Sequence, residues 1–317
     1  MNELKEKARR AFYAIKRKIP IDIPIRTWLK ILNAIIDPII LYGSEIWGPL
    51  TNQTFPQWEK HPVEALHAEL CKIILGVHRH TANNACRAEL GQFPLIIKIQ
   101  KRAIKFYQHL KSSEPQSYHY KALQCQELNK DKSSFCQLIT QLCPQDKHQP
   151  IWPNQIISEQ KENYIKYWNE TTKLQSKLEF YLTLNRKYVF ADYLSTVKDR
   201  KLQKTLTKYR LCAHNLAIET GRYRKNWLPR EARLCSFCHQ GDVESENHFL
   251  LHCEKYRDER KILFDKINNL YPGFIHLPDP QKLPYLCGEK SKCTMLAAKY
   301  VDYCHTLREA CYQAASN

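Results

Sequence analysis

The feature that most constrains the fold is a cysteine-histidine segment in the last third of the chain. Cys235 and Cys238 are followed by nine residues and His248, and Cys253 comes after four more, a C-x2-C-x9-H-x4-C spacing. Two close pairs of soft or borderline ligands are typical of closed tetrahedral Zn²⁺ sites, which leave no position open for a reactive water. We therefore predict one structural Zn²⁺ on these four side chains.

The same spacing indicates the local backbone around the metal. The first cysteine pair can straddle a tight turn, and we expect the His-x4-Cys pair on the opening turn of the following helix. His239 and His252 are alternatives to His248 as the histidine ligand.

Helical periodicity dominates the rest of the sequence. Only eight glycines occur, mostly at the ends of helical patterns, which argues against a many-stranded barrel. The segment 28–47 is rich in Ile and Leu and should be a buried helix interrupted at Asp37-Pro38, because proline removes a helical hydrogen bond. Apolar residues also recur at helical spacing in the segments 4–19, 64–75, 84–90, 94–112, 159–184, 199–219, 254–270 and 290–314.

These patterns predict a mainly α fold in three parts. A helical region covers 1–111, and a polar linker and helical middle region covers 112–198. A C-terminal helical region covers 199–317 and includes the small zinc finger at 235–253.

Net charge indicates a polyanionic partner. The chain has 49 Lys and Arg against 32 Asp and Glu, a formal charge of +17, which favours RNA or DNA. The alternatives are an anionic membrane surface and a charge that only keeps the chain soluble. Segment 94–112 contains no acid, and one face of its predicted helix is basic. The alternative interpretation is that this face is only solvated. The basic face consists of Lys98, Lys101, Arg102 and Lys105.

A second basic surface precedes the finger. Residues 201–233 contain nine basic side chains against two acids, a net of +7, whereas 235–253 contains three acids and no Lys or Arg. We therefore expect the finger to brace this basic arm rather than to hold phosphates itself. Aromatic and cationic residues alternate in the arm, and such a combination can stack on bases and bind phosphates. The candidate nucleic-acid-binding residues are Arg222, Tyr223, Arg224, Lys225, Arg230 and Arg233. The alternative is that Tyr223 and Trp227 pack on a neighbouring helix.

The amino-terminal sequence predicts an intracellular protein, nuclear and/or cytoplasmic. MNELKEKARRAFYAIKRKI has no apolar stretch of signal-peptide length, and no run of about 18 uncharged apolar residues occurs anywhere in the chain. We expect no association with membranes, and the thirteen cysteines should be free thiols or metal ligands rather than disulfides.

Several stretches resemble one family of polyproteins. KARRAFYAIKRKI, WLKILNAIIDPIILYGSEIWGP at 28–49, RHTANNACRAELGQFPL at 79–95 and ARLCSFCHQGDVESENHFLLHCEKYRDER at 232–260 resemble the thumb-like region and the C-terminal cysteine-histidine segment of LINE-type non-LTR retrotransposon reverse transcriptases. The resemblance implies that region 1–111 is thumb-like and that the chain contacts template, primer or element RNA.

The polymerase residues of that family do not occur in this sequence. Its active site needs a Tyr/Phe-Ala-Asp-Asp turn, and no Asp-Asp pair exists here; Phe190-Ala191-Asp192-Tyr193 lacks the second Asp, and we expect an exposed Asp192 in an ordinary segment. We assign no catalytic residue and predict a zinc-containing nucleic-acid-binding fragment of a reverse transcriptase that has lost the polymerase palm.

The alternative function is protein interaction. The apolar helices of 28–47 would then dock on a palm domain supplied in trans or on another protein, and the candidate contact residues are Trp28, Ile31, Ile35, Ile39 and Trp47.

Overall fold

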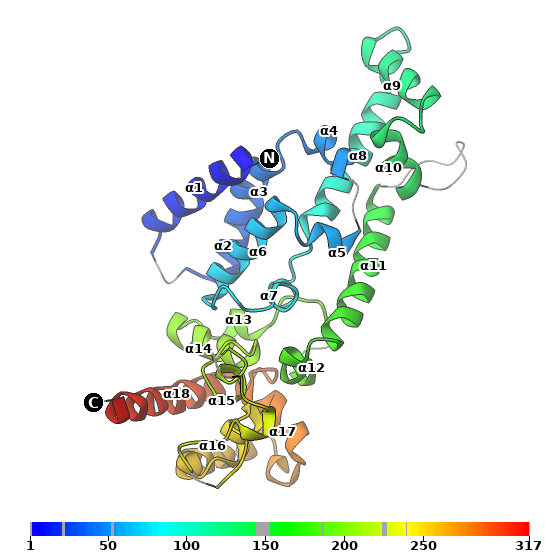
Figure 1. Cartoon of the computed structure of the whole chain (residues 1–317). Coiled ribbons are helices and arrows are strands. Elements are labelled where there is room, and N and C mark those ends of the chain that lie inside the picture. Colours follow the sequence, from blue (N-terminus) through cyan, green and yellow to red (C-terminus); the bar gives the residue numbers. More distant parts are fainter. Residues whose placement is uncertain are drawn as a thin grey trace. The chain divides into compact units, whose positions relative to one another are not determined.

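A computed structural model describes residues 2–20, 23–51, 54–143, 153–184, 187–223, 227–238 and 240–316, with the backbone alone for Thr51 and 312–316. These residues form helices and turns, and no β-strand occurs among them (Figure 1). Extended backbone pairs only at an isolated antiparallel bridge between Leu234 and Val243. The mainly α fold is confirmed for this part of the chain.

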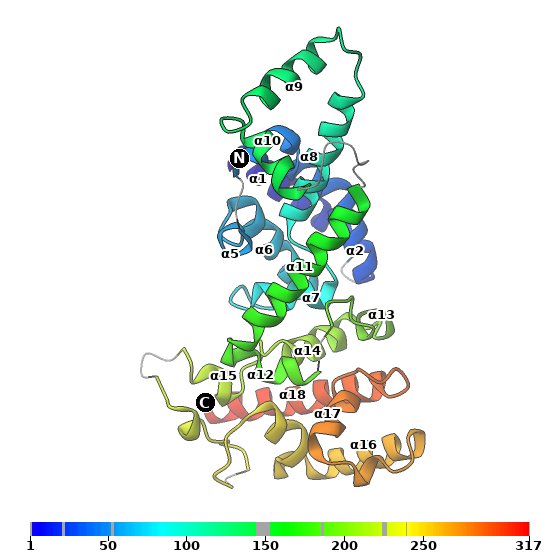
Figure 2. The same ribbon diagram turned by 90° about the vertical axis from the view of Figure 1, so that its right-hand side faces the viewer.

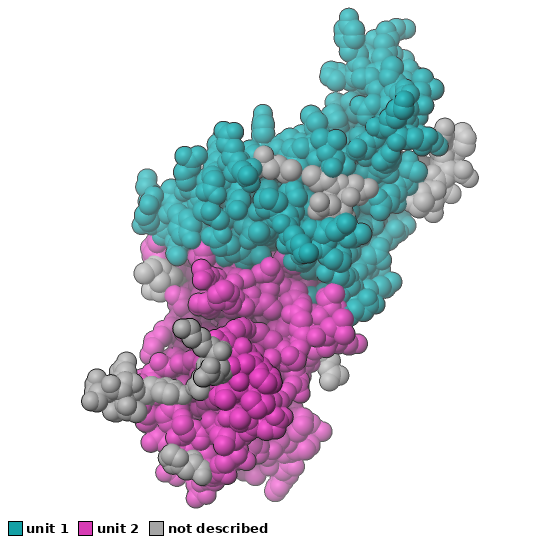
Figure 3. Space-filling view, viewed as in Figure 1, with its two compact units in different colours: residues 1–18, 29–69, 93–170 teal, residues 19–28, 70–92, 171–317 magenta. Residues whose placement is uncertain are grey.

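The described chain divides into two compact units, each made of segments distant in sequence (Figure 3). The first unit contains 1–18, 29–69 and 93–170, and the second contains 19–28, 70–92 and 171–317. The predicted boundaries after residues 111 and 198 are not tested by this division. The predicted linker region does form regular helices, two of them capped at the N-terminus by the Ser117 and Ser133 hydroxyls.

The first unit is built around buried aliphatic and aromatic side chains. Phe12, Leu32, Ile36, Leu66 and Ile104 are almost fully buried. Its helices are α1 (Asn2–Lys18), the π-helical turn η1 (Leu32–Ile36), α3 (Asp37–Ile40), α4 (Ser44–Trp47), η2 (Pro49–Thr51), α5 (Phe55–Trp58), α8 (Leu95–Lys111), α9 (Tyr118–Leu128) and α10 (Ser134–Leu142). Three further helices have residues in both units: α2 (Ile25–Ile31), α6 (Pro62–Leu75) and α11 (Pro153–Lys173).

The second unit has its core between α14 and α18, which lie side by side in Figures 1 and 2. Leu206, Tyr209, Leu216, Ile267 and Val301 are fully buried there. The helices are α7 (Asn83–Leu90), η3 (Ser176–Leu178), α12 (Glu179–Leu184), α13 (Tyr193–Thr196), α14 (Arg200–Arg210), α15 (Ala217–Thr220), η4 (Arg230–Ala232), the π-helical turn η5 (His248–His252), η6 (Glu254–Tyr256), α16 (Arg257–Leu270), η7 (Phe274–His276), α17 (Asp279–Leu286) and α18 (Thr294–Ser316).

A buried ion pair ties α7 to α14 within the second unit. Arg210 Nε donates to Glu89 Oε1 at 2.6 Å, and both side chains are inaccessible to solvent. Arg210 also donates to the Cys287 carbonyl and pairs with Glu289. A buried charge needs such partners, because removing one of them leaves an uncompensated ion.

The predicted interruption at Asp37-Pro38 is confirmed as a π-helical turn. Pro38 has no N–H, and in an α-helix its ring would collide with the Ala34 carbonyl. The backbone widens over Leu32–Ile36 instead, and the Asp37 N–H donates to the Leu32 carbonyl five residues earlier. The helix therefore continues past Pro38 as α3, with no loop between the two parts.

The predicted single helix at 199–219 is two helices. α14 ends at Arg210, where Cys212 adopts a left-handed φ of 50° and the Ala213 N–H donates to the Lys208 carbonyl at 2.7 Å. The chain then turns so that His214 and Leu216 are buried. The apolar period continues through this turn, which explains why the sequence pattern does not reveal it.

The short helices α5 and α13 were not predicted, and neither was α17. Its sequence DPQKLPYL contains Pro280 in the first turn, where the missing N–H is tolerated, and Pro284 in the interior. Among all the described helices, none combines the length and the hydropathy needed to span a bilayer.

Candidate metal centre and basic surface

Four ligand atoms converge in the second unit. The metal-binding atoms of Cys235, Cys238, His248 and Cys253 all lie within 4.8 Å of one another. Cys235 Sγ is 3.9 Å from Cys253 Sγ, and Cys238 Sγ is 3.4 Å from His248 Nε2. Around a tetrahedral Zn²⁺ with bonds of about 2.3 Å to sulfur and about 2.0 Å to nitrogen, these separations are about 3.8 and about 3.5 Å. The predicted cluster is thus present and can hold one metal ion.

A short backbone ribbon positions the first ligand pair. The Cys235 N–H donates to the Asp242 carbonyl at 2.8 Å, and the Glu244 N–H donates to the Arg233 carbonyl at 2.9 Å. The ribbon reverses through Gly241, whose φ is +79°. The two cysteines lie on the turn that this ribbon closes, as the C-x2-C spacing predicts.

The second ligand pair lies on a π-helical turn rather than on the opening turn of an α-helix. In an α-helix residues five apart point about 140° away from each other, because each residue turns by about 100°. The turn η5 instead closes with a hydrogen bond from the Cys253 N–H to the His248 carbonyl at 2.7 Å. The wider turn brings both side chains to the same side, and α16 begins only at Arg257.

The two ring nitrogens of His248 have separate environments. Nε2 faces Cys238, while Nδ1 is 3.5 Å from the Asp242 carboxylate. A carboxylate beside the second nitrogen is the usual arrangement around metal-bound histidine, since it fixes the tautomer. Of the two alternatives, His252 lies outside the cluster and pairs with Asp279 at 3.0 Å, and His239 falls outside the described residues.

Hydrogen bonds favour the thiolate form of the first ligand. The bond from the Cys253 thiol lowers the pKa of Cys235 to about 3, with the backbone N–H groups of Phe237 and Cys238 acting in the same direction. The same bond raises the pKa of Cys253. Thiolate is the form that binds metal ions, so the backbone of this turn is already arranged for a metal-bound sulfur.

The acids of the finger mainly serve the fold. Both Glu244 carboxylate oxygens accept hydrogen bonds from Arg308 of α18, at 2.9 and 2.7 Å, and Glu246 is 2.9 Å from His214. Glu244, Glu246 and Arg308 are all buried. The finger is therefore attached to the core of the second unit through buried polar contacts that no sequence pattern revealed.

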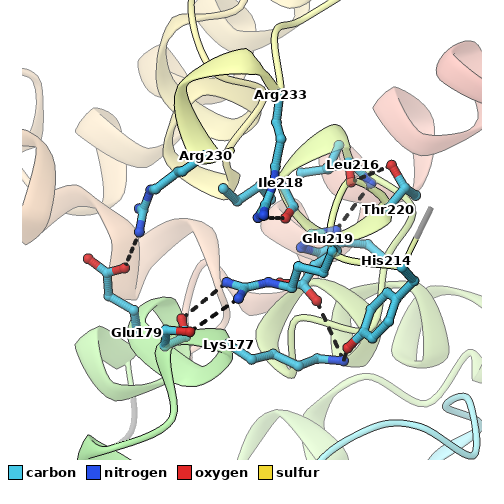
Figure 4. Close-up of polar contacts among 12 residues, drawn as sticks. Lys177, Glu179, His214, Leu216, Ile218, Glu219, Thr220, Arg230 and Arg233 are labelled. Atoms are coloured by element: carbon cyan, nitrogen blue, oxygen red, sulfur yellow. Dashed lines mark hydrogen bonds and ion pairs between the residues drawn. The ribbon is translucent and has the colours of Figure 1, made fainter. Parts of the chain in front are cut away.

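The basic arm is joined to η3 and α12 by polar contacts (Figure 4). Arg222 binds Glu219 at 2.9 Å and the Ser176 hydroxyl and carbonyl, and Arg230 binds Glu179 at 2.6 Å. Each guanidinium is thereby held in place with part of its charge balanced by a carboxylate.

Lys177 is a member of this surface that the sequence analysis missed. Its Nζ lies 3.0 Å from the Tyr223 hydroxyl and 3.5 Å from Glu219. Burial raises the pKa of Glu219, while Lys177 and Arg222 oppose that shift. Lys177 is 46 positions from Tyr223 in the sequence, and no local pattern could have paired them.

Tyr223 and Trp227 are exposed, at 64% and 66% of their surface. The Tyr223 ring contacts the neighbouring helix η3, because Lys177 Nζ lies 5.3 Å from the centre of that ring. Arg233 is different from the rest of the arm, because it is buried and its guanidinium donates to the Ile218 and Leu228 carbonyls. Arg224 and Lys225 fall outside the described residues.

The basic face predicted at 94–112 lies on α8 in the first unit. Lys98 pairs with the buried Asp37, and Arg102 donates to the Leu41 carbonyl and lies 3.6 Å from Glu45. Lys105 is exposed and Lys101 is half-buried. Two of the four cations thus help to fix the turns around α3 and α4.

Asp192 is exposed and precedes α13 (Tyr193–Thr196). Comparisons with protein-family models, curated proteins and solved structures give no match to the chain.

Proposed function

We propose that this protein is a zinc-containing nucleic-acid-binding chain, equivalent to the thumb-like and C-terminal parts of a LINE-type reverse transcriptase and without its own polymerase site. One observation carries the proposal: the Cys₃His cluster directly follows, in the chain, a basic arm on which Tyr223 and Trp227 are exposed. The metal is structural, since four protein ligands complete a tetrahedral shell. The resemblance to the reverse transcriptases supports the partner class.

Zinc is favoured over other metals by the donor set. Three thiolates and one imidazole at tetrahedral separations suit Zn²⁺, whereas Mg²⁺ and Ca²⁺ require oxygen ligands. The test is the metal content of the purified chain by mass spectrometry, for wild type and for Cys235→Ser combined with Cys238→Ser. One zinc per chain should be lost in the double variant, while Cys125→Ser, at an exposed cysteine outside the cluster, should retain it.

Nucleic-acid binding by the arm should combine stacking and charge. Each base stacked on an aromatic ring contributes about 1–3 kcal/mol, so Tyr223→Ala with Trp227→Ala should weaken binding of a single-stranded oligonucleotide by at least about tenfold. Replacing Arg222, Arg224 and Lys225 by Ala should flatten the dependence of affinity on salt. Fluorescence anisotropy at several salt concentrations measures both effects.

The matched control is Tyr303→Ala, an exposed tyrosine on α18. Equal affinity of the arm variants, the control and wild type would refute the proposed surface. A primer-extension assay tests the remaining part of the proposal, because nucleotide incorporation by the chain alone would overturn the absence of a polymerase site.

A specific observation favours protein interaction as a second candidate function. Tyr42, Ile46 and Leu50, around α4, are 75%, 67% and 72% exposed. Of the side chains suspected from the sequence, Trp28 is buried and Ile35 is 45% exposed. Ile46→Asp should then abolish any salt-insensitive oligomer seen by gel filtration, and a wild-type monomer that retains no partner would remove this candidate.

A further inference from the structure

A hollow of about 550 Å³ in the second unit lies apart from the finger ligands. Three segments line it: the turn after α6 with His78, the end of α14 with the following loop, and α18 with His305 and Glu309. Its volume falls within the range of small-molecule pockets, about 300–1,000 Å³. The backbone beside it includes the left-handed Cys212.

The walls of the hollow have hydrogen-bond donors in surplus. Lys208 has no ion pair or hydrogen-bonded acceptor among the described residues. His305 uses Nδ1 toward the Tyr209 hydroxyl, and His78 uses Nδ1 to accept the His80 N–H. The Nε2 atom of each of these two rings is left for another partner.

Several acceptors around the hollow already have partners. Glu309, the one acid among the residues that line it, accepts a hydrogen bond from Asn215. His214 is turned toward Glu246. The Gly76 and Val77 N–H groups satisfy the Lys72 carbonyl at the end of α6, so this helix end offers few free carbonyls to repel an anion.

A further lysine contacts the segment that follows this turn. Lys72 Nζ donates to the Arg79 carbonyl at 2.7 Å. Burial lowers the pKa of Lys72, and the charges of Arg87 and Lys177 act in the same direction. Lys72, Arg79 and Lys177 thus give this part of the second unit a positive field.

We propose that the hollow binds one phosphate group, with Lys208 as its charged ligand and with Nε2 of His78 and of His305 as hydrogen-bond donors. The phosphate belongs either to a free phosphate compound or to a nucleic-acid strand, and the second source rests on the proposed function. Protonation of His305 is coupled to binding because an anion favours the charged imidazole.

The groups that face His305 make its protonation sensitive to such an anion. Burial lowers the pKa of His305, and the cations Lys208 and Arg308 lower it as well, while Glu309 and Asp302 act in the opposite direction. His78 lies beside Arg79 and His80, with the two imidazole rings 5.0 Å apart. An anion bound beside Lys208 and His305 would offset the repulsion that the Lys208 charge exerts on a protonated His305 ring.

The test uses inorganic sulfate, a phosphate analogue whose charge does not change with pH in this range. Histidine ring resonances of the full chain are followed by NMR during a sulfate titration, with His78 and His305 assigned from His78→Gln and His305→Gln. Both resonances should shift saturably, and the affinity should be about tenfold tighter at about pH 6 than at about pH 8.

Two lysine variants on the same helix decide the outcome. Lys208→Met should weaken sulfate binding by about tenfold or more, because a charged hydrogen bond is lost. Lys201→Met, which removes an exposed lysine paired with Asp302, should leave it unchanged. A response that does not saturate, or one that is the same in the two variants, would overturn the site.

The source of the phosphate is decided by a second titration, with a single-stranded oligonucleotide. If Lys208→Met weakens binding of the strand and of sulfate, the strand supplies the phosphate. If it weakens sulfate alone, the ligand is a free anion. Failure of every variant to bind the strand would refute the proposed function while the sulfate result still stands.

Discussion

Arg308 is the residue that attaches the finger to α18. It is fully buried, binds both oxygens of Glu244, and lies 5.1 Å from the centre of the Phe237 ring. Arg308→Met should therefore leave a buried carboxylate without its partner and lower the free energy of unfolding by about 3–5 kcal/mol.

Urea unfolding measures this loss, and a double variant separates its causes. Arg308→Met with Glu244→Gln removes both charges, so it should recover part of the stability lost in the single variant. A double variant that is less stable than wild type by the full sum of the two single effects would contradict the pairing.

His61 predicts a pH dependence in the first unit. Its ring stacks on Trp58 with centres 4.2 Å apart, and both ring nitrogens are buried without a hydrogen-bond partner among the described residues. Burial lowers the pKa of His61 below 6.5, against the opposing charge of Glu64.

The unfolded chain then binds a proton at a higher pH than the folded chain does. The contribution of His61 to stability is fully present above pH 6.5 and is lost as the pH falls toward the lowered folded pKa. His61→Phe keeps an aromatic ring in the stack and should reduce this loss in chemical unfolding at a series of pH values. His119→Phe, at an exposed histidine of the same unit, should follow wild type, and an identical slope in both variants would argue against the prediction.

At the scale of single elements, Gly91 ends α7 in a conformation that other residues rarely adopt. Its φ is +62°, and a Cβ atom there would lie 2.8 Å from the Phe190 backbone nitrogen. Gly91→Ala should cost about 1–3 kcal/mol of unfolding free energy, since both backbone strain and a backbone contact oppose the methyl group.

Gly273→Ala is the matched comparison. Gly273 has a φ of +90° with open space around it, so the substitution has the strain without the close contact. Thermal unfolding should rank Gly91→Ala as the less stable of the two, and the reverse order would show that the close approach is relieved at little cost.

The elements differ in how much of them the sequence predicts. Helices such as α1, α6 and α8 were predicted because an apolar face recurs every three to four residues and a glycine or proline marks an end. The π-helical turn η5 was not, because the H-x4-C spacing shows which residues bind and not how the backbone brings them together. The sequence does not predict α17, because a proline such as Pro284 in a helix interior removes a hydrogen bond and usually ends the helix.

The same difference separates the two candidate sites. The four cluster residues follow from local spacing, which ligand chemistry restricts closely. Contacts such as that between Lys177 and Tyr223 join residues 46 apart, and the burial of Arg233 depends on carbonyls of other segments. Charge composition identified a basic arm but could not show which of its cations serve the fold.

At the scale of the whole molecule, the metal should stabilise far more than its own loop. The finger contacts α18 and the loop before α15 through Glu244 and Glu246, so a chelator should lower the melting temperature by at least about 3 °C. Hydrogen exchange should show the loss of protection in α15 and α18, with α1 and α8 as the internal comparison. Unchanged exchange in α18 would contradict the proposed role of the metal.

The buried pair of Arg210 and Glu89 determines how this protein can be dissected. A truncated chain of residues 171–317 would contain the finger, the basic arm and Arg210, but it would lack α7 and therefore Glu89. An expressed piece chosen from sequence continuity alone would thus keep Glu289 beside the buried Arg210 but would lose Glu89, the fully buried partner of this cation. Loss of binding by such a piece would report misfolding, and interpretable dissection requires point substitutions in the intact chain.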